Sequence, residues 1–400
     1  MNKRNIIFFA GLVGYILLAV CLYFEQAMDI MNTTVFALHY GHGFLSRGVL
    51  GTFLQLWDQY SSVDLLSYHT VYQISEAATA LYLILLLLFV FTVIRKVTVT
   101  YELQIKWISL ILMFISVPMF LSRDNFGRLD VYLMILTLFC LILLMEEKGE
   151  WLIVPAVTFA AILHEGFVFM NLNIILVLLF YKILTRSEKK DKIKYGILFL
   201  LCFLLPSAFF LYFEFFSHTF GMGVYLEVKE LAQRLSMDGG FHEQVLRHEI
   251  LGEDIRGLEV EHHRWNREDL PVFLVLFLPY ILLMIGFFRD YWKKNETVAE
   301  KWAALAVLAG PLTMLPEFIL KVDYGRYVFA ICFYYLAMVL VLFVLRDEKM
   351  MNNVVLWYQK IAKNKLAALM GILYLFLFLP FRGYRICDVV TTIVSIIFKN

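Results

Sequence analysis

Charged side chains are scarce in this sequence. Only 17% of the 400 residues are Asp, Glu, Lys or Arg, whereas 61% are hydrophobic. Soluble globular domains contain about a quarter charged and about half apolar residues, so this composition excludes an ordinary soluble domain. The formal net charge of +1 says little about partners, and nothing in the sequence indicates a nucleic-acid partner.

Cysteine and the common enzyme signatures are also largely missing. Four of the five cysteines lie in apolar runs, so we expect neither a disulfide framework nor a cysteine metal cluster. There is no P-loop, no Rossmann glycine pattern and no G-x-S-x-G turn. The segment HEQVLRHE (242–249) spaces its histidines too widely for a zinc-protease helix. No cofactor is predicted and no metal ligand is assigned, although a divalent metal stays open.

Long apolar runs, by contrast, are abundant. Many approach or exceed the ~18 residues that a helix needs to cross a bilayer. We therefore predict an all-α, polytopic integral membrane protein in which residues 1–400 form one membrane domain, with an uncleaved first span. Hydropathy predicts about eleven transmembrane helices, at 5–24, 77–94, 104–121, 130–145, 151–163, 167–184, 196–213, 271–288, 302–320, 327–345 and 366–380.

Basic residues predict the orientation of these spans. The run TRSEKKDKIK (185–194) marks a cytoplasmic loop, which places the N-terminus in the cytoplasm. Most Lys then lie inside, whereas most Arg and all nine His lie outside. The planar guanidinium of Arg matches phosphate, and His exchanges protons near neutral pH. We therefore expect any chemistry on the outer face.

Two outer loops are long, at 25–76 and 214–270. The first contains HYGHGFLSRGVLGTFLQLW (39–57), whose apolar residues recur at helical spacing and predict an amphipathic helix on the membrane surface. The second contains several polar helical stretches that are broken at glycines. It is too small and too polar to be a catalytic domain alone, and we interpret it as a cap over a site.

Two short outer loops resemble each other. LSRDNFGRLD (121–130) and LKVDYGRY (320–327) each combine a basic residue, an aspartate, an aromatic residue and Gly-Arg at the mouth of a helix. Arg123, Asp124 and Arg128, with Asp323 and Arg326, are predicted to bind substrate phosphate, the aspartates fixing the arginine rotamers. The alternative is that both pairs only anchor helices at the interface.

The ionisable pair in AAILHEGFVF (160–169) is a second candidate. The fifth predicted span is short, so we expect His164 and Glu165 to close a hairpin that dips into the membrane, where such groups are usually functional. They are candidate catalytic residues, or else a polar plug in a broken helix. Asp29, with Glu25 as an alternative, is a candidate general base just after the first span. Arg47 binds either substrate or lipid headgroups.

This layout resembles two groups of membrane enzymes. A cytoplasmic N-terminus, an acidic residue after the first span and a long outer loop with a surface helix are similar to the GT-C glycosyltransferases. That resemblance implies a polyprenyl-phosphate sugar donor and gives the base role to Asp29 or Glu25. The Arg and His residues expected on the outer face are similar to those that bacterial O-antigen and capsule polymerases and ligases use. The residues that match those families in kind are Arg47, Arg123, Arg128, His164 and Arg326.

The resemblance implies a cell-envelope glycan assembly enzyme of the bacterial inner membrane. Its partners would be a polyprenyl-(pyro)phosphate-linked sugar donor, a glycan acceptor and membrane lipids, and transferase, polymerase and ligase activities all stay open. One alternative is a lipid-linked glycan flippase that forms no bond, for which polar groups along a transmembrane path are expected. Another is a structural envelope subunit in which these residues are dispensable.

Overall fold

The computed structural model describes residues 3–24, 27–62, 64–121, 125–216, 219–253, 279–280, 282–320, 324–366, 368–369, 371, 381–382 and 385–386. These residues are helical apart from loops and one antiparallel pair of two-residue strands, β1 (Phe381–Arg382) and β2 (Arg385–Ile386). The predicted all-α fold class is confirmed.

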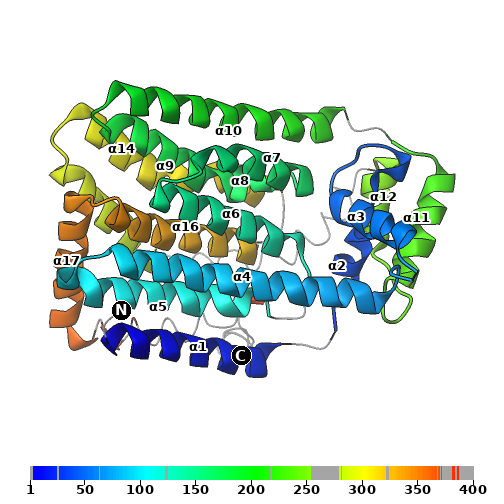
Figure 1. Ribbon diagram of the computed structural model, residues 1–400, viewed down its shortest axis with the longest axis horizontal. Coiled ribbons are helices and arrows are strands. Elements are labelled where there is room, and N and C mark those ends of the chain that lie inside the picture. Colours follow the sequence, from blue (N-terminus) through cyan, green and yellow to red (C-terminus); the bar gives the residue numbers. More distant parts are fainter. Residues whose placement is uncertain are drawn as a thin grey trace, which may run out of the picture.

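A bundle of long helices forms the body of the molecule (Figure 1). Among the described residues, seven helical segments are long and apolar enough to cross a membrane, so the chain is a membrane protein. The predicted span 366–380 lies largely outside these residues, and half of the predicted span 271–288 does, while its described residues 279–280 and 282–288 are helical. The seven segments comprise α1 (Lys3–Tyr23), α4 (Tyr68–Lys96), α5 (Glu102–Met119), α6 (Leu129–Glu146), α10 (Lys189–Phe215), α14 (Val298–Ala309) with its continuation, and α16 (Tyr324–Val344).

A hairpin of shorter apolar helices packs among these spans. It consists of η3 (Glu150–Leu152), α7 (Ile153–Leu163), α8 (Phe167–Met170) and α9 (Leu172–Thr185). At about 1.5 Å per residue the ascending arm rises only about 20 Å, which is less than the ~30 Å hydrocarbon thickness of a bilayer. The turn between α7 and α8, which carries His164 and Glu165, therefore lies below the tips of the long helices.

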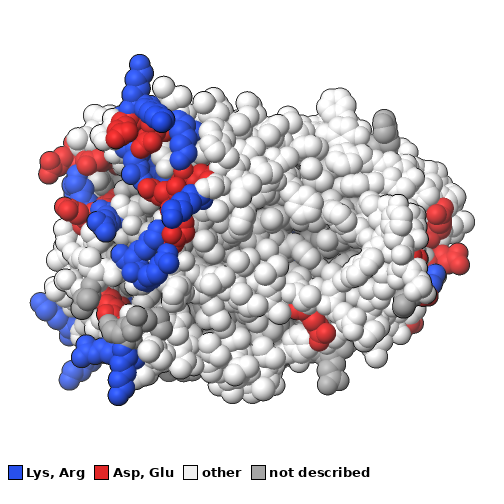
Figure 2. All heavy atoms as spheres, in the orientation of Figure 1, with Lys and Arg blue, Asp and Glu red and all other residues white. Residues whose placement is uncertain are grey.

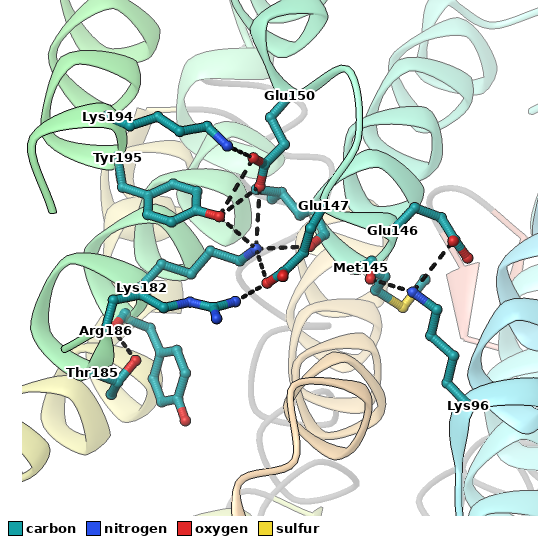
Figure 3. A network of polar contacts seen from close by, with 12 residues as sticks. Lys96, Met145, Glu146, Glu147, Glu150, Lys182, Thr185, Arg186, Lys194 and Tyr195 are labelled. Atoms are coloured by element: carbon teal, nitrogen blue, oxygen red, sulfur yellow. Dashed lines mark hydrogen bonds and ion pairs between the residues drawn. The ribbon is translucent and has the colours of Figure 1, made fainter. Parts of the chain in front are cut away.

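The base of this hairpin is fixed by a buried ionic network (Figure 3). Lys182 of α9 is 1% exposed and donates to the carbonyl of Leu144 at 2.9 Å and to Glu147 and Glu150 at 3.0 and 3.2 Å. Tyr195 of α10 donates to Glu150 at 3.0 Å. A buried ammonium is tolerated only when its hydrogen bonds are made in this way. The network joins α6, η3, α9 and α10 at one level.

Charged side chains gather at the same end of the molecule on the face in view. Figure 2 shows Lys and Arg there together with Asp and Glu, next to a broad band of almost uncharged surface. Helix α17 (Glu348–Lys363) crosses the helix ends at this pole (Figure 1). Its N-cap Asp347 accepts hydrogen bonds from Tyr181 at 2.8 Å and Tyr291 at 2.5 Å. An apolar band beside a charged pole is the pattern of a protein seated in a bilayer.

A small helical lobe occupies the opposite end (Figure 1). It combines the two long loops and has a hydrophobic core of its own, with Leu38, Leu54, Val228 and Leu246 among its buried members. The two loops thus fold against each other and do not extend separately into solvent. The elements of the lobe are α2 (Ile30–Val35), η1 (Tyr40–His42), α3 (Val49–Tyr60), the first turns of α4, α11 (Met222–Arg234) and α12 (Glu243–Leu251).

Helix α3 is the predicted surface helix, but it begins later than the sequence pattern indicates. Residues 39–48 form a 3₁₀ turn and a loop, and the α-helix starts at Val49. Its exposed apolar residues Phe53, Leu56, Trp57 and Tyr60 recur at i, i+3, i+4 and i+7, opposite the buried Leu54. This exposed apolar stripe is the feature expected of a helix that contacts lipid.

A second helix break lies beside the hairpin. After α14 the chain forms the 3₁₀ helix η4 (Gly310–Met314) and then α15 (Leu315–Leu320). A separate 3₁₀ turn, η2 (Val99–Tyr101), precedes α5 elsewhere in the bundle. Asn173 of α9 donates to the carbonyl of Gly310 at 3.3 Å, and the Thr313 hydroxyl donates to the carbonyl of Phe169 at 3.1 Å. Side chains from each break therefore satisfy backbone groups of the other, as non-helical backbone at membrane depth requires.

Candidate functional site

The turn between α7 and α8 presents the first two candidate residues. His164 is the C-cap of α7 in an extended conformation, and its Nδ1 accepts a hydrogen bond from the Gly166 amide at 3.1 Å. Glu165 Oε2 lies 3.2 Å from the same Nδ1 and accepts a hydrogen bond from the Ser46 hydroxyl. Nδ1 of His164 therefore faces both a backbone N–H donor and a carboxylate oxygen, so it accepts from Gly166 when unprotonated and donates to Glu165 when protonated.

Arg47 reaches this turn from the loop that precedes α3. Its Nη2 lies 2.7 Å from Glu165 Oε1, and its Nε lies 3.4 Å from Oε1 of Glu249 on α12. The backbone of Arg47 has φ +62°, a left-handed conformation that costs a non-glycine residue roughly 1–2 kcal/mol. Such a conformation persists only where surrounding contacts enforce it, and it is common at functional sites.

The two look-alike Gly-Arg segments meet at one carboxylate. Arg326 Nη2, at the start of α16, donates to Asp130 Oδ1 at 2.6 Å. Arg128 Nε, at the mouth of α6, lies 3.6 Å from Asp130 Oδ2, while its Nη1 donates to Asn125 at 3.3 Å. Arg128 is 4% and Arg326 is 8% exposed. Arginines that are about 200 residues apart in sequence therefore flank one buried acid.

These two groups form one polar cluster. His164 acts electrostatically on Asp130, and Arg326 acts on Arg47, so the groups lie within range of each other. Five elements contribute: the loop before α3, α6, the α7–α8 turn, α12 and α16. Figure 1 shows α4 extending past the ends of α6 and α7 toward the lobe, which supplies Arg47 and Glu249 to the cluster.

The two glutamates that contact Arg47 have pKa values shifted in opposite directions. Burial would raise the pKa of Glu165, but Arg47 and His164 outweigh burial and hold the pKa of that carboxyl well below its usual range. Burial raises the pKa of Glu249, and the charge of Glu165 raises it further, with only partial compensation by Arg47. Despite burial, Glu165 and Glu249 also raise the pKa of Arg47. Two carboxyls with opposite shifts are the arrangement that acid–base chemistry uses.

The other sequence candidates lie elsewhere or outside the described residues. The carboxylate of Asp29 caps α2, accepting a hydrogen bond from the Met31 amide at 2.8 Å, and no described contact joins it to the arginine cluster. Structure is not described for Glu25, Arg123, Asp124 and Asp323. The predicted pairs Asp124–Arg128 and Asp323–Arg326 therefore stay predictions.

The sequence interpretation missed three members of the cluster: Ser46, Asp130 and Glu249. Asp130 stands two residues after Arg128, and an acid at the mouth of a membrane helix was the available signal. Glu249 lies in the loop that we interpret as a cap, within the segment whose histidine spacing does not fit a zinc motif. No local spacing pairs α12 with Arg47, because that contact depends on how the two loops pack. Among the described residues, the carboxylates of this cluster do not form a set of potential metal ligands. His39, His42 and Glu227 do form such a set.

Comparisons of the chain with protein-family models, with curated proteins and with solved structures give no match.

Proposed function

We propose that this chain is a cell-envelope glycan assembly enzyme that transfers or polymerises sugars from a polyprenyl-(pyro)phosphate-linked donor at the outer face of the membrane. The observations that carry the proposal are Arg128 and Arg326 on either side of Asp130 and, within electrostatic range of them, the group of Arg47, Glu165 and Glu249, in which the pKa of Glu249 is raised. The buried guanidiniums of Arg128 and Arg326, with that of the 14% exposed Arg47, supply the donors that a phosphate group needs. The raised pKa of Glu249 supplies a group for proton transfer.

The chemistry follows from these roles. An acceptor hydroxyl attacks the anomeric carbon of the donor sugar, a new C–O bond forms, and the bond to the lipid (pyro)phosphate breaks. The arginines stabilise the negative charge of the departing phosphate. Ionised Glu249 takes the hydroxyl proton. Glu165, which stays ionised, holds Arg47 and Ser46 in position, and His164 beside it contacts a substrate oxygen.

The same proposal includes the finer topology. The pole with most of the Lys and Arg faces the cytoplasm, as expected from the positive-inside rule, and about eleven spans place the lobe outside the bacterial inner membrane. Charge at one pole supports this orientation (Figure 2). The apolar stripe of α3 would lie in the outer interface, next to the path by which a polyprenyl chain enters.

A second candidate function is the movement of a lipid-linked glycan without bond formation. The paired helix breaks favour it, because broken helices that meet at membrane depth form the substrate sites of many transporters. The contacts between Asn173 and Gly310 and between Thr313 and Phe169 are of this kind. The cluster at one end of the bundle, on the other hand, favours an enzyme that works on one face.

The test is reconstitution of the full chain in vesicles with a polyprenyl-pyrophosphate glycan, following both product size and lipid translocation. We expect longer or transferred glycan from the wild type. Glu249→Gln is expected to lower turnover about 10²–10⁴-fold while donor binding survives. Glu243→Gln, an exposed position on the same helix, is the matched control and should leave turnover unchanged. Translocation without any bond formation would overturn the proposal in favour of transport.

A further inference from the structure

A compact set of potential metal ligands lies in the lobe, apart from the arginine cluster. His39, His42 and Glu227 each offer one donor atom, and these atoms lie within 4.8 Å of one another. His39 caps the 3₁₀ turn η1, and His42 ends it. With three residues per 3₁₀ turn, positions i and i+3 project from the same side. The two imidazole rings accordingly stand 4.9 Å apart.

The burial of His39 and the missing hydrogen bond of His42 Nε2 are features that a bound cation would explain. The His39 side chain is buried, at 5% exposed, and imidazole binds metals in its neutral form. The Nε2 atom of His42 is buried without a hydrogen-bond partner, although Glu227 Oε1 stands 3.3 Å away. A buried nitrogen directed at a carboxylate and a second imidazole is suited to coordination.

We propose that His39, His42 and Glu227 bind one divalent transition-metal cation of the Zn²⁺ class. Two imidazoles and one carboxylate with an open fourth position are an established ligand set for Zn²⁺. Metal–ligand bonds of about 2.1 Å require donor atoms about 3.4 Å apart in a tetrahedral site. The carboxylate can make this adjustment, because the Glu227 side chain is 65% exposed.

Binding has one identifiable cost. Nδ1 of His39 accepts a hydrogen bond from the Gly41 amide at 3.1 Å. A neutral imidazole has a single free lone pair, so coordination through either ring nitrogen displaces this bond. The cation would replace a bond within η1 by a link between η1 and α11. It would thereby fix the loop that leads to Arg47 against the helix pair that carries Glu249, so it acts as a positioning element for the site.

The test uses the full chain in detergent, purified without a histidine tag, and Zn²⁺ as the probe. We expect about one Zn²⁺ per chain, a rise in the thermal unfolding temperature on adding Zn²⁺, and a tetrahedral visible spectrum with Co²⁺. Glu227→Gln, at an exposed position that should not affect folding, is expected to weaken binding about tenfold or more. His42→Ala is expected to abolish it.

His69→Ala is the matched control, because His69 is an outer-face histidine that bonds only to exposed Gln73 among its described contacts. It should bind Zn²⁺ like the wild type. Absence of Zn²⁺ binding by the wild type, or equal binding by wild type, Glu227→Gln and His42→Ala, would overturn the proposal. Because the readouts are stoichiometry, unfolding temperature and spectrum, the result is independent of whether the chain proves to be a transferase or a transporter.

Discussion

Asp130 gives two arginines from distant segments a common partner. Its carboxylate is bonded to Arg326 and faces Arg128, and all three side chains are at most 14% exposed. Removing one member of such a buried set leaves unpaired charge in a medium of low dielectric constant, which commonly costs about 3–5 kcal/mol. At the scale of single residues, the site is therefore sensitive to changes in geometry as well as charge.

Arg326→Lys should lose most glycan assembly activity. Lysine keeps the positive charge but replaces the planar fork with a point charge, which cannot contact Asp130 and a phosphate in the same geometry. Glycan product per unit of purified protein is the measurement. The control is Arg247→Lys, which changes an exposed arginine of α12 that pairs with Glu243 and Glu253. Normal assembly by Arg326→Lys would show that this arginine only anchors α16.

The raised pKa of Glu249 predicts the pH dependence of the reaction. A base must be ionised, so turnover should rise with pH as Glu249 loses its proton, at a pH above the ~4.3 that is usual for glutamate. The rate–pH profile of the wild type measures this acidic limb. Glu249→Gln should lack the limb as well as most of the rate. A wild-type profile without any such limb would contradict the assignment of Glu249 as base.

Residue chemistry could be predicted in part. The sequence analysis named Arg47, Arg128, Arg326, His164 and Glu165 as candidates, because charge at membrane depth is costly. The structure pairs Arg47 with Glu165 and places Arg128 and Arg326 beside Asp130, while a function for these residues stays a prediction. Asp130 and Glu249 could not be paired with them from sequence. Their partners lie on other elements, and no periodicity relates positions that meet only through tertiary packing.

At the scale of elements, the lobe depends on a close approach of α3 to the chain before it. A Cβ atom on Gly51 would lie 2.1 Å from the carbonyl oxygen of Leu38 and 2.5 Å from that of Phe36. Both obstacles are backbone atoms, which cannot move aside as a flexible side chain would. Helix α3 therefore has to shift as a whole if any larger residue is placed there.

Gly51→Ala should destabilise the lobe and increase its susceptibility to limited proteolysis. The expected effect is comparable to overpacking a core, about 1–3 kcal/mol. Gly223→Ala on α11 is the control, because nothing lies within 4 Å of its Cβ position and alanine favours a helix by about 0.5–1 kcal/mol. Equal protease resistance of Gly51→Ala and the wild type would show that α3 can shift without cost.

Element boundaries followed hydropathy well for uninterrupted spans and poorly at breaks. The helices α4 and α10 extend beyond the predicted spans 77–94 and 196–213. The first turns of α4 pack in the lobe, where Val71 is buried, whereas the first turns of α10 are charged and mostly exposed, and hydropathy registers neither. The start of α3 was misplaced, since residues 39–48 share its apolar spacing but turn at Gly43 and Arg47, both of which have positive φ. Backbone conformation of that kind depends on neighbours.

At the scale of the whole molecule, one pole carries most of the Lys and Arg on the face in view, mixed with Asp and Glu (Figure 2), and the lobe forms the other pole (Figure 1). The proposed orientation predicts which pole a membrane-impermeant thiol reagent reaches in intact cells. In a chain whose native cysteines are replaced, Gln73→Cys on the lobe end of α4 should be labelled. Lys192→Cys, at the start of α10, should be labelled only after the cells are opened. The reverse pattern would invert the topology and place the arginine cluster in the cytoplasm.

The hairpin of α7 and α9 has a consequence for communication across the bilayer. The hairpin is fixed at its base by Lys182 and Glu150 and carries His164 and Glu165 at its tip. Because α7 and α9 also pack against α6 and α10, a displacement at the base would reach the tip through packed side chains. Changes in ionic conditions at the charged pole would thus alter the alignment of groups near the far side, with no ligand having to cross the membrane.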